Sequence, residues 1–127
     1  ATTRRTYEQL MAIATVIVDA GFPAIVDATS LRHADRQTFR KLAERLGARP
    51  SIIFCEAPRE TLRARVAARV ARGTDASDAT LEVLTHQLSV FEPPTDDEKT
   101  IVQLICTDTD PQMLQARCEA IAAILAQ

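Results

Sequence analysis

Hydrophobic positions along the chain change repeatedly between helical spacing and short continuous runs. Apolar residues recur at intervals of three and four, as on one face of a helix, over 3–20, 35–46, 57–72, 78–90 and 111–126. Short apolar runs, typical of strands buried on both faces, lie between them at 24–27, 51–56 and 101–106. Because strands that alternate with helices form parallel sheets through right-handed crossovers, the pattern predicts a three-layer α/β fold with helices on both faces of a parallel sheet.

Capping residues mark several of the expected helix ends. All three glycines follow a predicted helix, where a left-handed residue commonly closes the last turn: Gly21, Gly47 and Gly73. Pro58 suits a first helical turn, because its missing N–H would have no partner there. Ser77 and Asp78 are candidate N-caps, and Asp110 followed by Pro111 should begin the last helix.

The composition predicts a single soluble domain. The chain has 127 residues, of which 46% are hydrophobic and 25% charged, as in ordinary globular domains. No apolar run approaches the roughly 18 residues of a membrane span, so we expect neither an anchor nor a membrane partner. The cysteines, odd in number and without a CxxC motif, are expected to be reduced core residues of a cytoplasmic protein: Cys55, Cys106 and Cys118.

The formal net charge of −2 is the balance of two oppositely charged parts. Residues 1–73 carry 13 Lys and Arg against 7 Asp and Glu, a charge of +6, and residues 74–127 carry 2 against 10, a charge of −8. Thirteen of the 15 basic residues are Arg, whose planar guanidinium group suits phosphate. Because the positive excess is local, the charge disfavours duplex nucleic acid or an anionic membrane as the main partner.

Candidate chemistry is expected beyond the carboxyl ends of the strands, where ligands bind in parallel α/β sheets. Asp27 ends the first expected strand, and Thr29 follows two residues later. A carboxylate and a hydroxyl at this spacing can hold a hydrated Mg²⁺ ion or orient an acceptor hydroxyl. The alternative is that Asp27 only caps the following turn.

The helix expected over 57–72 is rich in arginine. At about 100° per residue, Arg65, Arg69 and Arg72 fall within one narrow arc beside an apolar stripe. Three guanidinium groups on one arc, with no acidic residue at helical spacing, repel one another, which favours an anionic ligand such as phosphate. The alternative is a solvated basic face.

Other chemistries are disfavoured by the spacing of their residues. Neither His33 nor His86 has a Cys, His or carboxylate at metal-ligand spacing, so the sequence predicts no direct metal site. Ser30 and Ser77 lack the glycine frame of a hydrolase nucleophile.

The order of these motifs resembles that of small P-loop kinases. The likeness is carried by Gly21-Phe22-Pro23, Ile25-Val26-Asp27-Ala28-Thr29, Arg32 to Arg40, Ile52-Ile53-Phe54-Cys55, Arg72-Gly73 and Cys106-Thr107-Asp108-Thr109. The chain is similar to polynucleotide 5′-kinase, gluconate kinase and zeta toxin, and it most resembles the ATP-binding domain found in bacteria fused to aminoglycoside-phosphotransferase-like domains. The likeness corresponds to the carboxyl-terminal two-thirds of that family's domain.

This resemblance implies roles for individual residues. Asp27 matches the aspartate near the transferred phosphate, associated with the acceptor or Mg²⁺, and Thr29 lies beside it. Thr107 and Asp108 match the loop near the adenine. A lid-like helical segment over 57–91 supplies the arginines that would close over the ATP phosphates and stabilise the transferred charge: Arg65, Arg69 and Arg72.

One part of the family pattern does not occur in these residues. The family begins with a strand, a Gly-x-x-x-x-Gly-Lys-Ser/Thr loop and a helix, and the loop supplies the N–H groups, lysine and hydroxyl that hold phosphate and Mg²⁺. We therefore expect residues 1–127 to be a single α/β domain that is part of a longer P-loop kinase domain and inactive as the isolated chain. In related kinases the first strand lies between those equivalent to 25–27 and 52–56. We expect this slot to be filled by an upstream part of the polypeptide or a partner segment, or the two strands to pair directly.

The resemblance implies transfer of the ATP γ-phosphoryl group to a hydroxyl acceptor of unidentified kind, with Mg²⁺ as the cofactor. Two alternatives remain open. One is a non-enzymatic interaction or regulatory domain, in which the acidic stretch 75–98 and the arginine face contact a protein. The other is an ATP-hydrolysing switch that has no acceptor site.

Overall fold

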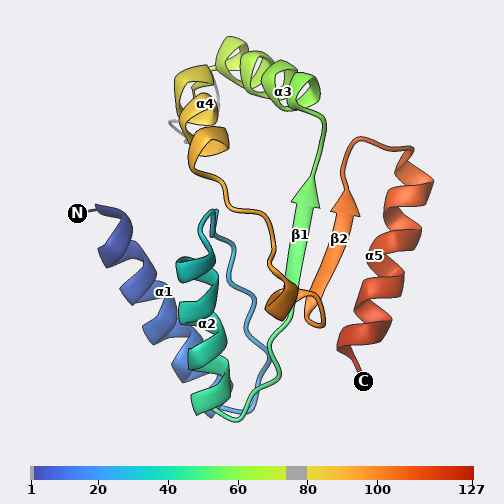
Figure 1. The fold of residues 1–127 in the computed structure, drawn as a ribbon. Coiled ribbons are helices and arrows are strands. Elements are labelled where there is room, and N and C mark those ends of the chain that lie inside the picture. The colour runs from blue at the N-terminus through green and yellow to red at the C-terminus, as the bar shows by residue number, and fades with distance from the viewer. Residues whose placement is uncertain (1, 74–79) are drawn as a thin grey trace. The chain divides into compact units, whose positions relative to one another are not determined.

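The computed structural model describes residues 2–73 and 80–127 (Figure 1). The chain forms two compact units, Ala1–Pro50 and Ser51–Gln127. In chain order the elements are α1 (Thr2–Asp19), α2 (His33–Arg45), β1 (Ile52–Glu56), α3 (Arg59–Arg72), α4 (Leu81–Val90), the 3₁₀ turn η1 (Asp96–Glu98), β2 (Val102–Cys106) and α5 (Pro111–Leu125). The described part of the chain is therefore α/β, as predicted. No helix within it is long and apolar enough to cross a bilayer.

The first unit is built on two packed helices, α1 and α2. Ala14 on α1 and Leu42 on α2 are buried, with 7% and 6% of their surface exposed. Helix α1 ends where the sequence predicted, because Gly21 has a φ of 86° and donates its N–H to Val18 O at 2.9 Å. A glycine adopts this left-handed conformation without a steric cost, and the chain can turn back along the helix.

The strand predicted at 24–27 is not formed. This run is extended, but it has no ladder partner among the residues that the structure describes, and the expected direct pairing with 52–56 is absent there. Side-chain burial still alternates along it: Val26 is half-buried, whereas Asp27 is exposed and Ile25 has 93% of its surface exposed. The prediction was wrong because an apolar run sets which side chains favour burial, whereas a strand also needs a second strand beside it.

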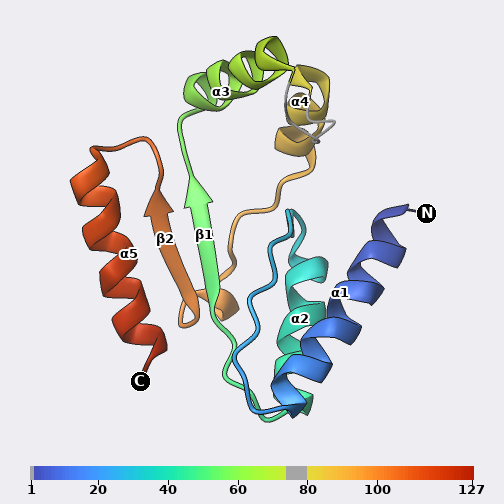
Figure 2. The ribbon, with the colours of Figure 1, turned by 180° about the vertical axis from the view of Figure 1, so that it is seen from behind.

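The second unit contains a parallel sheet of β1 and β2 (Figure 2). Residues 52–56 pair in order with 102–106, and Thr107 N–H extends the ladder by donating to Glu56 O at 2.8 Å. The two predicted strands in this unit and their parallel direction are confirmed.

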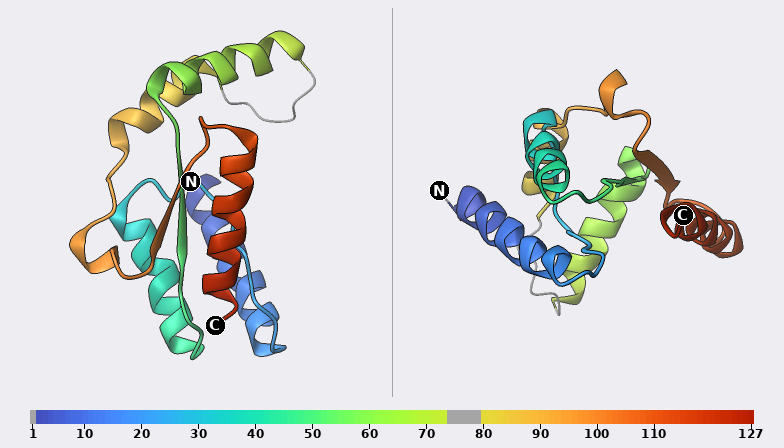
Figure 3. Two further views of the ribbon diagram at one scale, coloured as in Figure 1. Left: turned by 90° about the vertical axis from the view of Figure 1, so that its right-hand side faces the viewer. Right: turned by 90° about the horizontal axis from the view of Figure 1, so that it is seen from below.

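Helix α5 packs beside β2 (Figure 3). Ile105 on β2 and Ile121 on α5 are buried, with 7% and 2% of their surface exposed. Alternation along the strands directs Phe54 and Leu104 to the other face, where Phe54 stacks on Phe91 with ring centroids 5.6 Å apart. Leu104 is 49% exposed, so apolar surface remains open on this face.

The cysteines are free but exposed, not core residues as predicted: Cys55, Cys106 and Cys118. Cys55 stands beside Ile105 in register, but α5 packs on β2, and the neighbouring position on β1 stays uncovered. The apolar runs around Cys55 and Cys106 predicted burial on both faces, and a two-stranded sheet does not provide it, while Cys118 lies at an exposed position of α5.

The ends of the later helices follow the sequence in part. Pro58 is the N-cap of α3 and not a first-turn residue, and Gly73 ends α3 with a φ of 60°. Helix α4 is capped by Thr80, whose hydroxyl accepts Val83 N–H at 3.3 Å, while the predicted caps at 77 and 78 lie outside the described residues. Asp110 caps α5 as predicted.

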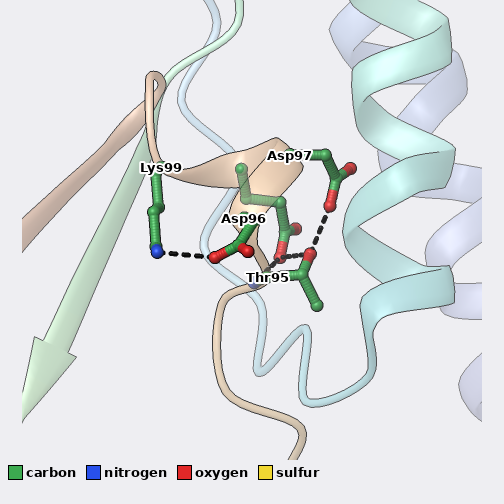
Figure 4. A network of polar contacts seen from close by, with 5 residues as sticks. Thr95, Asp96, Asp97 and Lys99 are labelled. Carbon is green, nitrogen blue, oxygen red and sulfur yellow. Dashed lines mark hydrogen bonds and ion pairs between the residues drawn. The ribbon is translucent and has the colours of Figure 1, made fainter.

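A polar turn between α4 and β2 was not predicted (Figure 4). Thr95 begins η1, and its N–H and hydroxyl both donate to Glu98 Oε2, at 3.0 and 3.1 Å. The Thr95 hydroxyl also contacts the Asp97 carboxylate, and Lys99 pairs with Asp96. Glu98 is fully buried, so this capping box fixes the chain before it enters β2.

Candidate functional site

The carboxyl ends of β1 and β2 lie side by side, because the strands are parallel and in register (Figure 1). Beyond β1 the chain enters α3, and beyond β2 it forms the 107–110 loop before α5. The left panel of Figure 3 shows α3 running across the end of β1. This edge brings the arginine helix next to the 107–110 loop, at the end of the sheet where parallel α/β proteins bind ligands.

Arg65 and Thr107 form the main contact between helix and loop. Arg65 Nη1 donates to Thr107 Oγ1 and Nη2 donates to Thr107 O, both at 2.7 Å. The Thr107 hydroxyl in turn donates to Glu56 O at 3.1 Å. A fork of two short charge-assisted bonds fixes the guanidinium plane, so Arg65 is held to the end of the sheet.

A second hydrogen bond joins the same two segments. Thr61 Oγ1, one turn before Arg65 on α3, donates to Asp108 Oδ2 at 2.8 Å. Three predicted nucleotide-binding residues therefore gather here: Arg65, Thr107 and Asp108. Sequence reasoning did not find Thr61, since a lone threonine in a helix carries no pattern that marks a partner 47 residues away.

Arg69 and Arg72 continue the arc of Arg65 toward the end of α3. Arg69 is half-buried, whereas Arg72 is exposed and immediately precedes the left-handed Gly73. Seven residues of helix place Arg72 about 10 Å along the axis from Arg65. One arginine of the arc is thus held at the sheet, and the last one extends away from it into solvent.

The other predicted site residues, Asp27 and Thr29, lie in the first unit. Both are exposed, and the period-two alternation along the extended chain puts them on the same side. Tyr7 of α1 reaches this segment, with its Oη 3.5 Å from Thr29 Oγ1 and accepting Ser30 N–H at 3.0 Å. Sequence reasoning did not single out Tyr7 for this role, because its partners are 22 and 23 residues away.

The donors at Asp27 and Thr29 fit a hydrated Mg²⁺ ion. The pair offers a carboxylate and a hydroxyl, the oxygen ligands that Mg²⁺ prefers, with room for the waters that it retains. Within residues 2–73 and 80–127, no three or more His, Cys, Asp or Glu side chains form a cluster that could hold a metal ion.

Comparison with protein families decides the class of the chain. A family model described as an AAA domain matches residues 1–94. The chain belongs to this AAA domain family. Searches of curated proteins and of solved structures returned no match.

Membership of the AAA domain family makes this a P-loop NTPase-like domain of the kinase type. The matched residues include the segment of Asp27 and Thr29 and the arginine helix α3. They end before β2, so Thr107 and Asp108 lie outside the matched residues and are joined to them by their contacts with α3 and by the hydrogen bonds from Thr107 to Glu56 O at the end of β1.

Proposed function

We propose that this AAA domain takes part in ATP-dependent phosphoryl transfer to a hydroxyl acceptor. In that reaction the bond from the γ-phosphorus to the β–γ bridging oxygen breaks, a bond to the acceptor oxygen forms, and ADP leaves. The observation that carries the proposal is the Arg65 fork at the end of the sheet. It fixes the start of an arginine arc at the edge where parallel α/β sheets bind ligands.

The arginine arc would serve the phosphates. Arg65, with Thr107 and Asp108, would contact the nucleotide, while Arg69 and Arg72 follow Arg65 on the same face of α3. Their positive charge would stabilise the negative charge that spreads over the phosphoryl oxygens during transfer. The solvent exposure of Arg72 supports its role as the arginine that contacts the transferred group.

Asp27 and Thr29 would serve the acceptor end of the reaction. The Asp27 carboxylate would accept a hydrogen bond or the proton of the attacking hydroxyl, or hold Mg²⁺ through water. Thr29 would orient the same group from the same exposed side. Bound Mg²⁺ would neutralise charge on the phosphates.

The glycine loop and first strand of the family are proposed to come from elsewhere in the same polypeptide or from a partner segment. The extended run 24–27 and strand β1 both lack a strand neighbour that the family pattern supplies, within the part of the chain that the structure describes. The 93% exposure of Ile25 supports a covering element at this position. A parallel strand carrying the glycine loop would pair with the second edge of β1.

The test compares turnover and binding in the full-length polypeptide that contains these residues. MgATP binding is titrated, and transfer of labelled γ-phosphate to sugars, nucleic-acid 5′ ends, aminoglycosides and protein hydroxyls is measured. Arg72→Ala should lower turnover by about a hundredfold or more, because a donor to the transferred charge is lost. Arg63→Ala, on the same helix outside the arc, is the matched control and should keep full turnover.

Two results would contradict the proposal: no ATP binding by the full-length polypeptide, or unaltered turnover in Arg72→Ala. ADP release without phosphorylation of any acceptor would instead identify an ATP-hydrolysing switch. Capture of a protein partner without nucleotide binding would identify an interaction domain.

A further inference from the structure

Ser30 is the one non-glycine residue with a left-handed backbone among the described positions, with a φ of 41°. Side chains with a Cβ are strained in this region, so such residues occur where their surroundings hold them there. Ser30 directly follows Thr29 and lies three residues after Asp27. Strained residues concentrate at functional sites, where the surrounding structure holds them in place.

Two helices hold the peptide groups on either side of Ser30. Tyr7 Oη on α1 accepts the Ser30 N–H at 3.0 Å. Arg36 Nη1 on α2 donates to Ser30 O at 3.2 Å and to Leu31 O at 3.5 Å. Both polar backbone groups of the strained residue are therefore bound from outside the loop, one by each helix.

The two holding side chains are themselves fixed. Arg36 has 5% of its surface exposed, an unusual degree of burial for a charged side chain. The Tyr7 ring packs on Phe39 of α2, with centroids 5.7 Å apart and planes at 51°. Because α1 and α2 also pack together, these groups form a rigid frame to which the loop must conform.

A glycine would adopt the same conformation without help, but it would leave the loop free to change. A serine held from both sides keeps a single conformation. That conformation sets where the preceding residues point, since Thr29 Oγ1 lies 3.5 Å from the same Tyr7 oxygen.

We propose that Tyr7 and Arg36 are positioning residues that hold Ser30 in its left-handed turn and thereby orient Thr29 and Asp27 toward the reacting groups. This inference rests on the proposed function, because it assigns the oriented side chains to phosphoryl transfer. Tyr7 and Arg36 act through the loop and do not touch ATP or the acceptor.

The test uses Tyr7→Phe in the full-length polypeptide, with MgATP as the probe and water as the acceptor. Loss of one hydroxyl should speed exchange of the Ser30 amide hydrogen about tenfold, measured by nuclear magnetic resonance. It should lower kcat for ADP release about tenfold, since small misplacement of reacting groups is costly. The KM for MgATP should change less than about twofold, because the nucleotide contacts proposed above involve other residues.

Thr15→Val is the matched control, because it also removes a hydroxyl from α1. The Thr15 hydroxyl donates to Met11 O within the helix and does not contact the loop. This variant should leave kcat and Ser30 exchange unchanged. Arg36→Lys, which replaces the guanidinium fork by one ammonium group, is the second variant and should show the same split between kcat and KM.

Unchanged kcat in both variants would overturn the inference, as would a fall in kcat without faster Ser30 exchange. Failure of the proposed function has a different signature: the unmodified polypeptide would not bind MgATP. In that case Ser30 exchange still decides whether Tyr7 and Arg36 hold the turn.

Discussion

The contact between Arg65 and Thr107 is predicted to contribute measurably to the stability of the second unit. Arg65→Met removes both 2.7 Å hydrogen bonds to Thr107. Thr107→Val removes the bond from Arg65 to the hydroxyl and the bond from that hydroxyl to Glu56 O, but it keeps the bond from Arg65 to the Thr107 carbonyl. The two changes together form a double-mutant cycle, which isolates the energy of the single bond that they share.

The magnitude follows from geometry and exposure. A buried hydrogen bond to a charged group contributes roughly 1.5–3 kcal/mol. Arg65 is exposed and Thr107 half-buried, so water competes for both, and each bond should contribute about 0.5–1 kcal/mol. Arg65→Met should therefore cost about 1–2 kcal/mol, and the shared bond should give a coupling energy of about 0.5–1 kcal/mol.

Equilibrium unfolding in urea, followed by far-ultraviolet circular dichroism, measures these free energies. A loss of 1–2 kcal/mol should move the midpoint by roughly 0.5–1 M urea. Arg63→Met removes an arginine from the same helix that makes no such fork and should shift the midpoint little. A coupling energy below about 0.2 kcal/mol would refute the reasoning, because the two side chains would then act independently.

Three further changes test single structural features, each by urea or thermal unfolding. Asp110→Ala should cost about 1 kcal/mol, because its carboxylate accepts two N–H groups at the start of α5, whereas Asp110→Asn should retain most of the cap. Gly73→Ala should cost about 1 kcal/mol and lower the Tm, since it forces a Cβ into a φ of 60°. Ile121→Ala should cost about 2–5 kcal/mol by opening a cavity, and Ile124→Ala, at a position 43% exposed, should cost clearly less.

Features set by a few neighbouring residues could be predicted from the sequence. Gly73 ends α3 and Asp110 begins α5 because capping depends only on the adjacent turn. The strands of the second unit were predicted for the same reason, since their apolar runs lie between clear helix signals. The described cap of α4 is Thr80, whose hydroxyl accepts Val83 N–H, and the caps predicted at 77 and 78 lie outside the described residues.

Features that depend on distant parts of the chain could not be predicted. The run at 24–27 has the composition of a strand, but among the described residues it has no ladder partner. The arginine arc was predicted from helical spacing, yet the Arg65 fork to Thr107 joins residues 42 positions apart. The left-handed turn at Ser30 depends on Tyr7 and Arg36, which no local pattern connects to it.

The second edge of strand β1 affects how strongly copies of this chain associate in solution. The strand pairs with β2 along one edge, and its other edge has no ladder partner in the described parts of the chain. An exposed row of N–H and C=O groups is a template for pairing with other molecules, and β1 has neither the lysine nor the proline that commonly blocks this. With Ile53 44% exposed in the same strand, the isolated chain should self-associate as its concentration rises. A strand paired with that edge would therefore prevent copies of the chain from pairing with one another and would keep the domain monodisperse.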